Sequence, residues 1–174
     1  MKKGFLTLFS FILSINMLFS QHCDKYISFE EDKTTGDKTY TANDFINIIK
    51  DGDTSLRVLT LLINHQKSMI LSITTVNRIK YVDPGDEIYF TFDDSTKYTL
   101  TGNQDFNTEG AFSIYLGDFK KNDELLKLLL TKKITAVRLY CRSGVLDVDL
   151  SKSNSDELFE EINCLNKLLK RSGS

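Results

Sequence analysis

Apolar and polar side chains alternate along residues 133–150, and this pattern predicts a β-hairpin. A two-residue turn at Ser143-Gly144 fits, because glycine supplies the positive φ that such turns need. A shift of one residue would reverse the two faces, so we expect a strongly specified register. We expect the arginine on the polar face to form a solvated ion pair and not to bind a ligand. The predicted pairs are Cys141–Leu146, Leu139–Val148 and Val137–Leu150 on the buried face, and Arg138–Asp149 and Tyr140–Asp147 on the exposed face.

A second hairpin is predicted over residues 88–100. A two-residue loop would set Phe92 opposite Lys97 and mix apolar with charged side chains. A three-residue loop, Asp94-Ser95-Thr96, separates the two kinds and is therefore preferred. The pairs that it predicts are Phe92–Tyr98 and Phe90–Leu100 on the inner face, and Asp93–Lys97 and Thr91–Thr99 on the outer face.

Further strands are predicted where short apolar runs are bounded by polar turns. In residues 56–63 both the even-numbered and the odd-numbered positions are mainly apolar. This pattern indicates a central strand that is covered on both faces. Residues 45–49 fit a helix capped by Asn43 or Asp44, or a strand, and their three isoleucines favour the strand. The other predicted strands are residues 26–30, 39–41, 69–76 and 112–116.

Two helices complete the expected fold. A short buried helix is predicted near 122–131, with Asn122 as its cap. A longer helix is predicted near 155–170, where Asn154 and Glu157 have the spacing of a capping box. We therefore predict an α+β fold, with a predominantly antiparallel β-sheet, curved or in a sandwich, covered by the C-terminal helix. The apolar stripe predicted along that helix is Leu158, Phe159, Ile162, Leu165 and Leu169.

The first twenty residues have a different character from the rest. Lys2 and Lys3 precede an apolar run, which predicts a signal peptide over residues 1–20 and a single β-rich domain over 21–174. A retained anchor is the alternative, although the run is shorter than the roughly 20 residues needed to span a bilayer. Lipidation of Cys23 is a second alternative, but His22 stands where a small residue is usual. We expect an exported protein with no transmembrane segment after cleavage.

Charge narrows the range of partners. The chain has 174 residues, 41% of them hydrophobic and 26% charged, as in an ordinary globular domain. Its net charge of −2 becomes −4 when Lys2 and Lys3 are removed with the signal peptide. There is no run of lysine and arginine of the kind that grips phosphate backbones, so we expect no nucleic-acid partner.

Three cysteines follow the apolar run, which in an exported protein suggests one disulfide and one free thiol. Cys141 shares the predicted inner face of its hairpin, where a thiol packs as a small hydrophobe. Cys164 lies far around the helix from the apolar stripe and can reach a tail outside the main core contact. We predict a Cys23–Cys164 disulfide, with Cys141–Cys164 as the alternative.

The candidate catalytic and metal-binding patterns are weak, and we predict no catalytic, cofactor-binding or metal-binding residues. The histidines, His22 and His65, fall in a tail and a turn, which disfavours a Cys–His pair, and no clustered zinc ligands occur. Alternating oxygens over residues 103–109 resemble a calcium loop but lack its glycine and final glutamate. The carboxylates open to glycoside hydrolysis are Asp93, Asp94, Asp147 and Asp149.

Two strings and a short ending carry a resemblance to a known group. They are residues 92–97 (FDDSTK), residues 130–140 (LTKKITAVRLY) and residues 162–165 (INCL). Together they resemble a group of small, uncharacterised secreted or exported bacterial proteins, over roughly residues 32–165. The chain departs from this group at Ser95, where the group often has glycine. The resemblance implies a β-rich domain and brings no catalytic residues.

These patterns do not specify an activity. The first hypothesis is an exported, non-catalytic domain that acts through contacts with a protein or a surface. The alternatives are a hydrolase whose carboxylates come from distant segments, and a small-ligand carrier with a cavity between sheet and C-terminal helix. An unprotected sheet edge or an exposed apolar patch would favour the first hypothesis.

Overall fold

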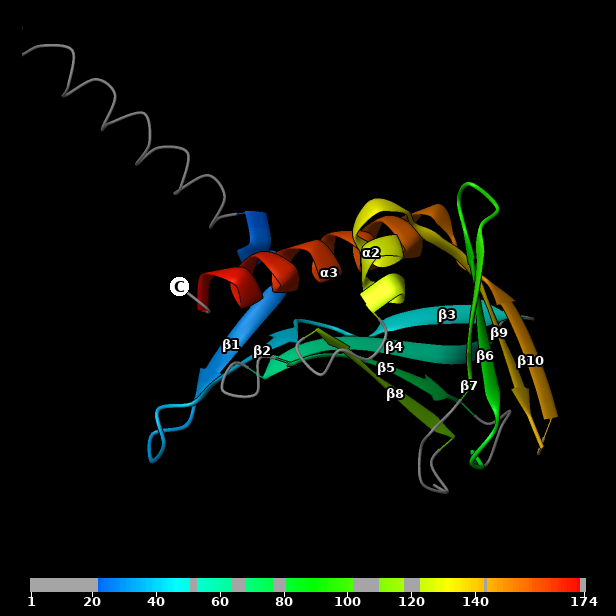
Figure 1. The fold of residues 1–174 in the computed structure, drawn as a ribbon, viewed down its shortest axis with the longest axis horizontal. Helices are drawn as coiled ribbons and strands as arrows, with labels where there is room; N and C mark the ends of the chain where they lie inside the picture. Colours follow the sequence, from blue (N-terminus) through cyan, green and yellow to red (C-terminus); the bar gives the residue numbers. More distant parts are fainter. Residues whose placement is uncertain are drawn as a thin grey trace, which may run out of the picture.

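The computed structural model describes residues 22–50, 53–63, 68–76, 81–101, 110–117, 123–142 and 144–172. The fold is α+β and mostly antiparallel β-sheet, as predicted (Figure 1). The predicted signal peptide lies outside the described residues, and its assignment stays a prediction. The same holds for Asn122, the expected cap of the short helix.

Six strands form the larger sheet, in the order β1-β2-β4-β5-β8, with β3 also pairing with β4. The central strand β4 is long enough for β2 to pair with its C-terminal end and β3 with its N-terminal end. A break over residues 43–45 therefore divides one edge of β4 between two strands. The bounds are β1 Ile27–Glu31, β2 Lys38–Ala42, β3 Ile46–Lys50, β4 Asp53–Ile63, β5 Ser68–Thr75 and β8 Ala111–Gly117.

Four strands form the smaller sheet, in the order β10-β9-β6-β7. Figure 1 shows this sheet at one end of the larger sheet, with its strands running across the direction of β3, β4 and β5. The inner faces of both sheets contribute to one continuous hydrophobic core. The bounds are β6 Glu87–Phe92, β7 Lys97–Thr101, β9 Ile134–Cys141 and β10 Gly144–Asp149.

Two helices cover the core. α3 (Lys152–Ser172) crosses the larger sheet and contacts β1, β3, β4 and β5, as well as β9 of the smaller sheet. α2 (Asp123–Thr131) lies between α3 and β8, with Leu125 and Leu129 buried. Neither of these helices combines the length and the apolarity that would let it span a membrane. The C-terminal helix therefore covers the larger sheet as predicted, and it also reaches the second one.

The β9–β10 hairpin exists, but its predicted register is wrong by two residues. Leu139 lies opposite Leu146 and Val137 opposite Val148, and Gly144, which was expected in the turn, pairs with Cys141 as part of β10. Because side chains alternate with a period of two, a shift of two leaves each residue on its predicted face. The predicted buried residues are accordingly buried: Val137, Leu139, Cys141, Leu146, Val148 and Leu150.

The β6–β7 hairpin shows the same kind of correction. Its loop has three residues as predicted, but it begins one residue earlier, at Asp93, and Phe90 pairs with Tyr98. The Phe92 N–H donates to the Thr96 carbonyl at 2.9 Å and closes the loop. Ser95 takes the left-handed conformation, with φ of 67°. That conformation completes a three-residue hairpin loop and normally favours glycine.

The start of α3 also differs from the prediction. The helix begins at Lys152, and its cap is Ser151, whose Oγ accepts the Asn154 N–H at 3.1 Å. Asn154 instead reaches β3, donating to the Asn47 carbonyl at 3.0 Å. The expected capping box at Asn154 is therefore wrong, because a serine three residues earlier caps the same helix.

The central strand β4 differs from its prediction on one face. Leu56, Val58 and Leu62 are buried against the helices, as expected. On the opposite face Leu59 and Leu61 are half-buried. The strand is central but only partly covered on its second face, because both helices lie on the same side of the larger sheet (Figure 1).

Replacing Ser95 with glycine should raise the free energy of unfolding by about 0.5–1 kcal/mol. Glycine removes the steric cost of a Cβ in the left-handed region, and this gain is partly offset by greater freedom in the unfolded chain. Ser95→Ala keeps the Cβ and should bring no gain. Urea unfolding of both variants tests this expectation, and equal destabilisation by the two would contradict it.

Candidate functional site

The outer face of the smaller sheet presents a regular array of side chains in three rows across the strands. Its two inner strands, β6 and β9, carry the aromatic and arginine residues, and its edge strands carry mainly threonine, lysine and aspartate. The rows, from β7 to β10, are Thr101–Glu87–Tyr140–Val145, Thr99–Tyr89–Arg138–Asp147 and Lys97–Thr91–Ala136–Asp149.

We call Tyr89, Arg138 and Tyr140 the Tyr–Arg cluster. The rings of Tyr89 and Tyr140 meet edge to face, with centroids 6.1 Å apart. The Tyr89 hydroxyl donates a hydrogen bond to the Glu87 carboxylate, and the Arg138 guanidinium donates to the Asp147 carboxylate. The cluster is thus held in place by two polar contacts and one ring contact.

These contacts fix the charge of the cluster at neutral pH. The hydrogen bond to Glu87 raises the pKa of Tyr89. The hydrogen bond from Arg138 lowers the pKa of the Asp147 carboxyl, and the same bond raises the pKa of Arg138. Arg138 forms the solvated ion pair that its position in the hairpin predicts. Its partner is Asp147 and not Asp149, as the corrected register requires.

The centre of this face is open to solvent. Tyr140 is 52% exposed, and Val145, its neighbour on β10, is 58% exposed. Tyrosine and arginine are enriched at the centres of protein interfaces, while lysine and aspartate are depleted there. Tyr140 and Arg138 lie on the face that the hairpin pattern predicts, whereas their neighbour Tyr89 was not predicted to join them. Only the β6–β9 pairing brings Tyr89 beside them.

The two strings that carried the family resemblance are in direct contact. The Lys132 ammonium lies 2.6 Å from the Asp94 carboxylate and donates to Thr96 Oγ1 at 2.8 Å. The Asp93 N–H donates to the Lys133 carbonyl at 2.9 Å. The segment before β9 therefore holds the β6–β7 turn. This contact gives these residues a structural role.

Three of the four carboxylates considered for hydrolysis, Asp93, Asp94 and Asp147, are engaged in other contacts. The hydrogen bond from Lys132 lowers the pKa of Asp94 to about 2. Asp147 is paired with Arg138, and Asp93 accepts the Lys133 N–H at 3.3 Å and is not paired with Lys97 as predicted. A general acid must hold its proton near neutral pH. The pKa values of Asp94 and Asp147 are instead lowered, so both groups are ionised at that pH.

Glu161 is a carboxyl group whose pKa is raised. It lies on α3 facing the larger sheet, is 2% exposed, and accepts a hydrogen bond from Thr60 Oγ1 of β4 at 2.9 Å. Burial raises its pKa to about 7, with smaller contributions from the charges of Glu157 and Asp44. The direct bond to Thr60 also means that no cavity separates helix and sheet at this point.

Glu161 was not predicted to be buried, although the sequence contains a signal for it. The residue falls three after Leu158 and four before Leu165, so it occupies the same stripe as these apolar residues. A charged residue on an apolar stripe must bury its carboxyl group or move out of the core. Glu161 buries it and retains one hydrogen bond.

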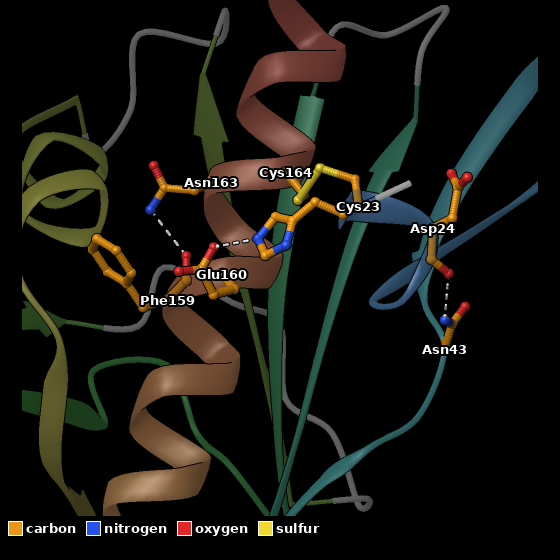
Figure 2. Close-up of a disulfide and its surroundings, with 8 residues drawn as sticks. Cys23, Asp24, Asn43, Phe159, Glu160, Asn163 and Cys164 are labelled. Atoms are coloured by element: carbon orange, nitrogen blue, oxygen red, sulfur yellow. Dashed lines mark hydrogen bonds and ion pairs between the residues drawn. A yellow bond between two sulfur atoms is a disulfide. The ribbon is translucent and has the colours of Figure 1, made fainter. Parts of the chain in front are cut away.

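The predicted disulfide is present. Cys23 is bonded to Cys164 with a Cα–Cα distance of 5.6 Å, which joins the segment before β1 to α3 (Figure 2). On the same side of the helix, His22 Nε2 lies 3.1 Å from the Glu160 carboxylate. Asn43 Nδ2 donates to the Lys25 carbonyl at 2.9 Å and holds the same segment from the sheet side. The alternative pairing of Cys141 with Cys164 is thereby excluded.

The free thiol is unsuited to nucleophilic chemistry. Cys141 is buried, and burial together with the nearby Asp86 carboxylate raises its pKa to about 12. A thiol with that pKa supplies almost no thiolate at neutral pH. Of the two histidines, His22 contacts Glu160, and His65 lies outside the described residues.

Metal binding is the remaining candidate chemistry. Within the ranges that the structure describes, no group of three or more His, Cys, Asp and Glu side chains is placed to hold a metal ion. Residues 103–109, which resemble a calcium loop, lie outside those ranges. Comparisons of the chain with family models, with curated proteins and with solved structures found no match. The resemblance seen in the sequence therefore stays a prediction.

The raised pKa of Glu161 predicts a pH-dependent stability. The unfolded chain releases this proton near pH 4.5 and the folded chain only near 7, so the contribution is complete below pH 4.5 and is lost as the pH rises to 7. The loss should be roughly 3 kcal/mol, at about 1.36 kcal/mol per pKa unit. Urea unfolding across this range should show a decline in the native protein.

Glu161→Gln keeps an acceptor for Thr60 but does not titrate, so this component of the pH dependence should disappear. Glu124→Gln, at an exposed position on α2, is the matched control and should follow the native curve. Parallel curves for the native protein and Glu161→Gln across the range would contradict the buried, protonated state of Glu161.

Loss of the disulfide should lower the free energy of unfolding by roughly 2–5 kcal/mol, because the bond closes a loop spanning 141 positions. Comparison of the native protein with Cys23→Ser/Cys164→Ser measures this loss. A reductant should destabilise the native protein by the same amount and leave the variant unchanged. Reductant sensitivity of the variant would indicate a different bond.

Proposed function

We propose that the chain is an exported domain that acts by binding a protein partner through the outer face of its smaller sheet, without a catalytic step. The observation that carries the proposal is the Tyr–Arg cluster, held in place at the centre of that face beside the exposed Val145. Rigid aromatic and arginine side chains give much contact area at a low entropic cost on binding.

The arrangement of the face has the anatomy of a protein interface. Tyr89, Arg138 and Tyr140 occupy the two inner strands, where a partner can exclude water from them. The outer positions on β7 and the end of β10 are polar, as a rim usually is. Arg138 is already neutralised by Asp147, so a partner need not supply a charge to it.

Export is supported by two features. The Cys23–Cys164 disulfide is of a kind that forms and persists in oxidising compartments. The basic and apolar pattern of residues 1–20 is typical of a signal peptide. We accordingly propose the periplasm, the cell surface or the extracellular space as the place where the domain works.

The pKa values and the burial of the candidate catalytic groups support a function without catalysis. Asp94 and Asp147 are held ionised by Lys132 and Arg138. Glu161, whose pKa is raised, is enclosed between α3 and β4, where a substrate cannot reach it. The thiol of Cys141 is buried and protonated.

Site-specific photo-cross-linking in the native cells tests this proposal. A benzophenone side chain in place of Tyr140 should label one discrete protein partner. The same group in place of Tyr115, which is exposed on β8 of the larger sheet, is the matched control and should not label it. Tyr140→Ala should weaken binding of that partner by about tenfold or more. Labelling from position 115 and none from position 140 would contradict the proposed face.

A further inference from the structure

Two charged residues on the outer face of the smaller sheet are not neutralised by any other part of the chain that the structure describes. Lys97 on β7 and Asp149 on β10 are both exposed, and neither side chain forms an ion pair or a hydrogen bond within the described ranges. The other charged groups in the three rows are occupied by the hydrogen bonds of the Tyr–Arg cluster. A partner that binds this face can therefore pair with these two charges.

The two charges lie at opposite edges of the same row. This row runs from Lys97 on β7 through Thr91 and Ala136 to Asp149 on β10. Neighbouring strands are about 4.8 Å apart, so three strand spacings separate the two residues by roughly 14 Å. They are too far apart to neutralise one another within one chain. A partner must supply an anion above the β7 edge and a cation above the β10 edge, at the same spacing.

We propose that the partner bound by this face is a second copy of the same chain, an inference that rests on the proposed function. The smaller sheets of the two copies pack face to face about a two-fold axis that runs along the strands, between β6 and β9. This rotation places β7 over β10 and β6 over β9 of the other copy, and each row over the same row. Lys97 of each copy then lies over Asp149 of the other, and the ion pair forms twice.

The same rotation also matches the residues at the centre of the face. Tyr89 lies over Arg138 of the other copy, where the ring and the guanidinium attract each other. Tyr140 lies over Glu87, whose carboxylate can accept a second phenolic hydrogen bond. No like charges meet in these rows. The remaining pairs across the interface are Thr91 over Ala136, Thr99 over Asp147 and Thr101 over Val145.

Other two-fold axes do not bring the two charges together. An axis across the strands sets every strand over its own copy, so Lys97 stays over β7. Through the middle row, such an axis would also set Arg138 over Arg138, which is unfavourable at an interface. Among the axes along the strands, only the one between β6 and β9 carries β7 onto β10. The positions of the two charges thus select one arrangement.

The size of the face determines how stable the dimer is. Both helices lie on the inner side of the smaller sheet, so a second sheet can approach its outer side (Figure 1). Three rows of side chains on its strands cover roughly 400–600 Å² per copy, which is less than the 800 Å² or so that each partner of a standard interface buries. The dimer should therefore be weak and reversible, with a dissociation constant in the micromolar range.

Charge reversal at each edge tests the pairing between copies. The disulfide-bonded native protein should show a monomer–dimer equilibrium in sedimentation. Lys97→Glu alone and Asp149→Lys alone should each weaken self-association by about tenfold or more, because like charges then face each other twice. A mixture of the two variants should associate again, since opposite charges meet at both contacts of the mixed dimer. Lys127→Glu, at an exposed position on α2, is the control for net charge and should dimerise like the native protein.

A carbodiimide tests the register, because it joins an amine only to a carboxylate in direct contact. It should link Lys97 of one copy to Asp149 of the other, and peptide mapping of the covalent dimer should recover this link. Within one copy the two groups are too far apart to react. Lys97→Arg is the matched control, since it keeps the charge and should still dimerise but supplies no amine for the link.

The results also separate this inference from the function on which it rests. Photo-cross-linking from position 140 that yields covalent dimers of this chain would support the second copy. Labelling of a different protein from position 140, together with a native protein that stays monomeric at high concentration, would overturn the second copy and leave the proposed face intact. No labelling from position 140 would overturn both. A mixture of Lys97→Glu and Asp149→Lys that fails to associate would overturn the pairing.

Discussion

The attachment of α3 to both sheets is the interaction on which the rest of the structure depends. In its first turns, Ser155 Oγ donates to the Ile134 carbonyl of the smaller sheet at 2.6 Å. Two turns later, Glu161 accepts the hydrogen bond of Thr60 from the larger sheet. Still further along, Cys164 is bonded to Cys23. Along the same helix Leu158, Ile162 and Leu165 are buried in the core that the two sheets share.

The proposed binding face follows from this arrangement. Because the helices lie on the inner side, the outer face of the smaller sheet stays open, and the Tyr–Arg cluster is displayed on a rigid scaffold.

Much of the fold could be predicted from the sequence, because burial follows the alternation of side chains. Both hairpins, the two helices and the buried residues of β9 and β10 are where the pattern places them. The registers could not be obtained in the same way. A shift of two residues preserves every face, so face sorting alone could not decide between Leu139–Val148 and the observed Leu139–Leu146. The register of the β6–β7 hairpin depends likewise on its turn, in which Ser95 adopts a conformation usually left to glycine.

The candidate surface was harder to predict than the core. The disulfide could be inferred because Cys164 falls off the apolar stripe and Cys23 lies in a tail. Glu161 was missed because the apolar stripe was traced through its hydrophobic members alone. The grouping of Tyr89 with Arg138 and Tyr140 depends on β6 pairing with β9, two strands that lie more than forty residues apart in the chain. No local pattern shows which distant strands become neighbours.

Native-state hydrogen exchange measures directly whether α3 joins the two sheets into one cooperative unit. The most protected amides of α3, of β4 in the larger sheet and of β9 in the smaller sheet should exchange with the same free energy of opening, equal to that of global unfolding. Protection of β9 that persists after α3 and β4 have exchanged would show that the smaller sheet folds independently, and would contradict this account.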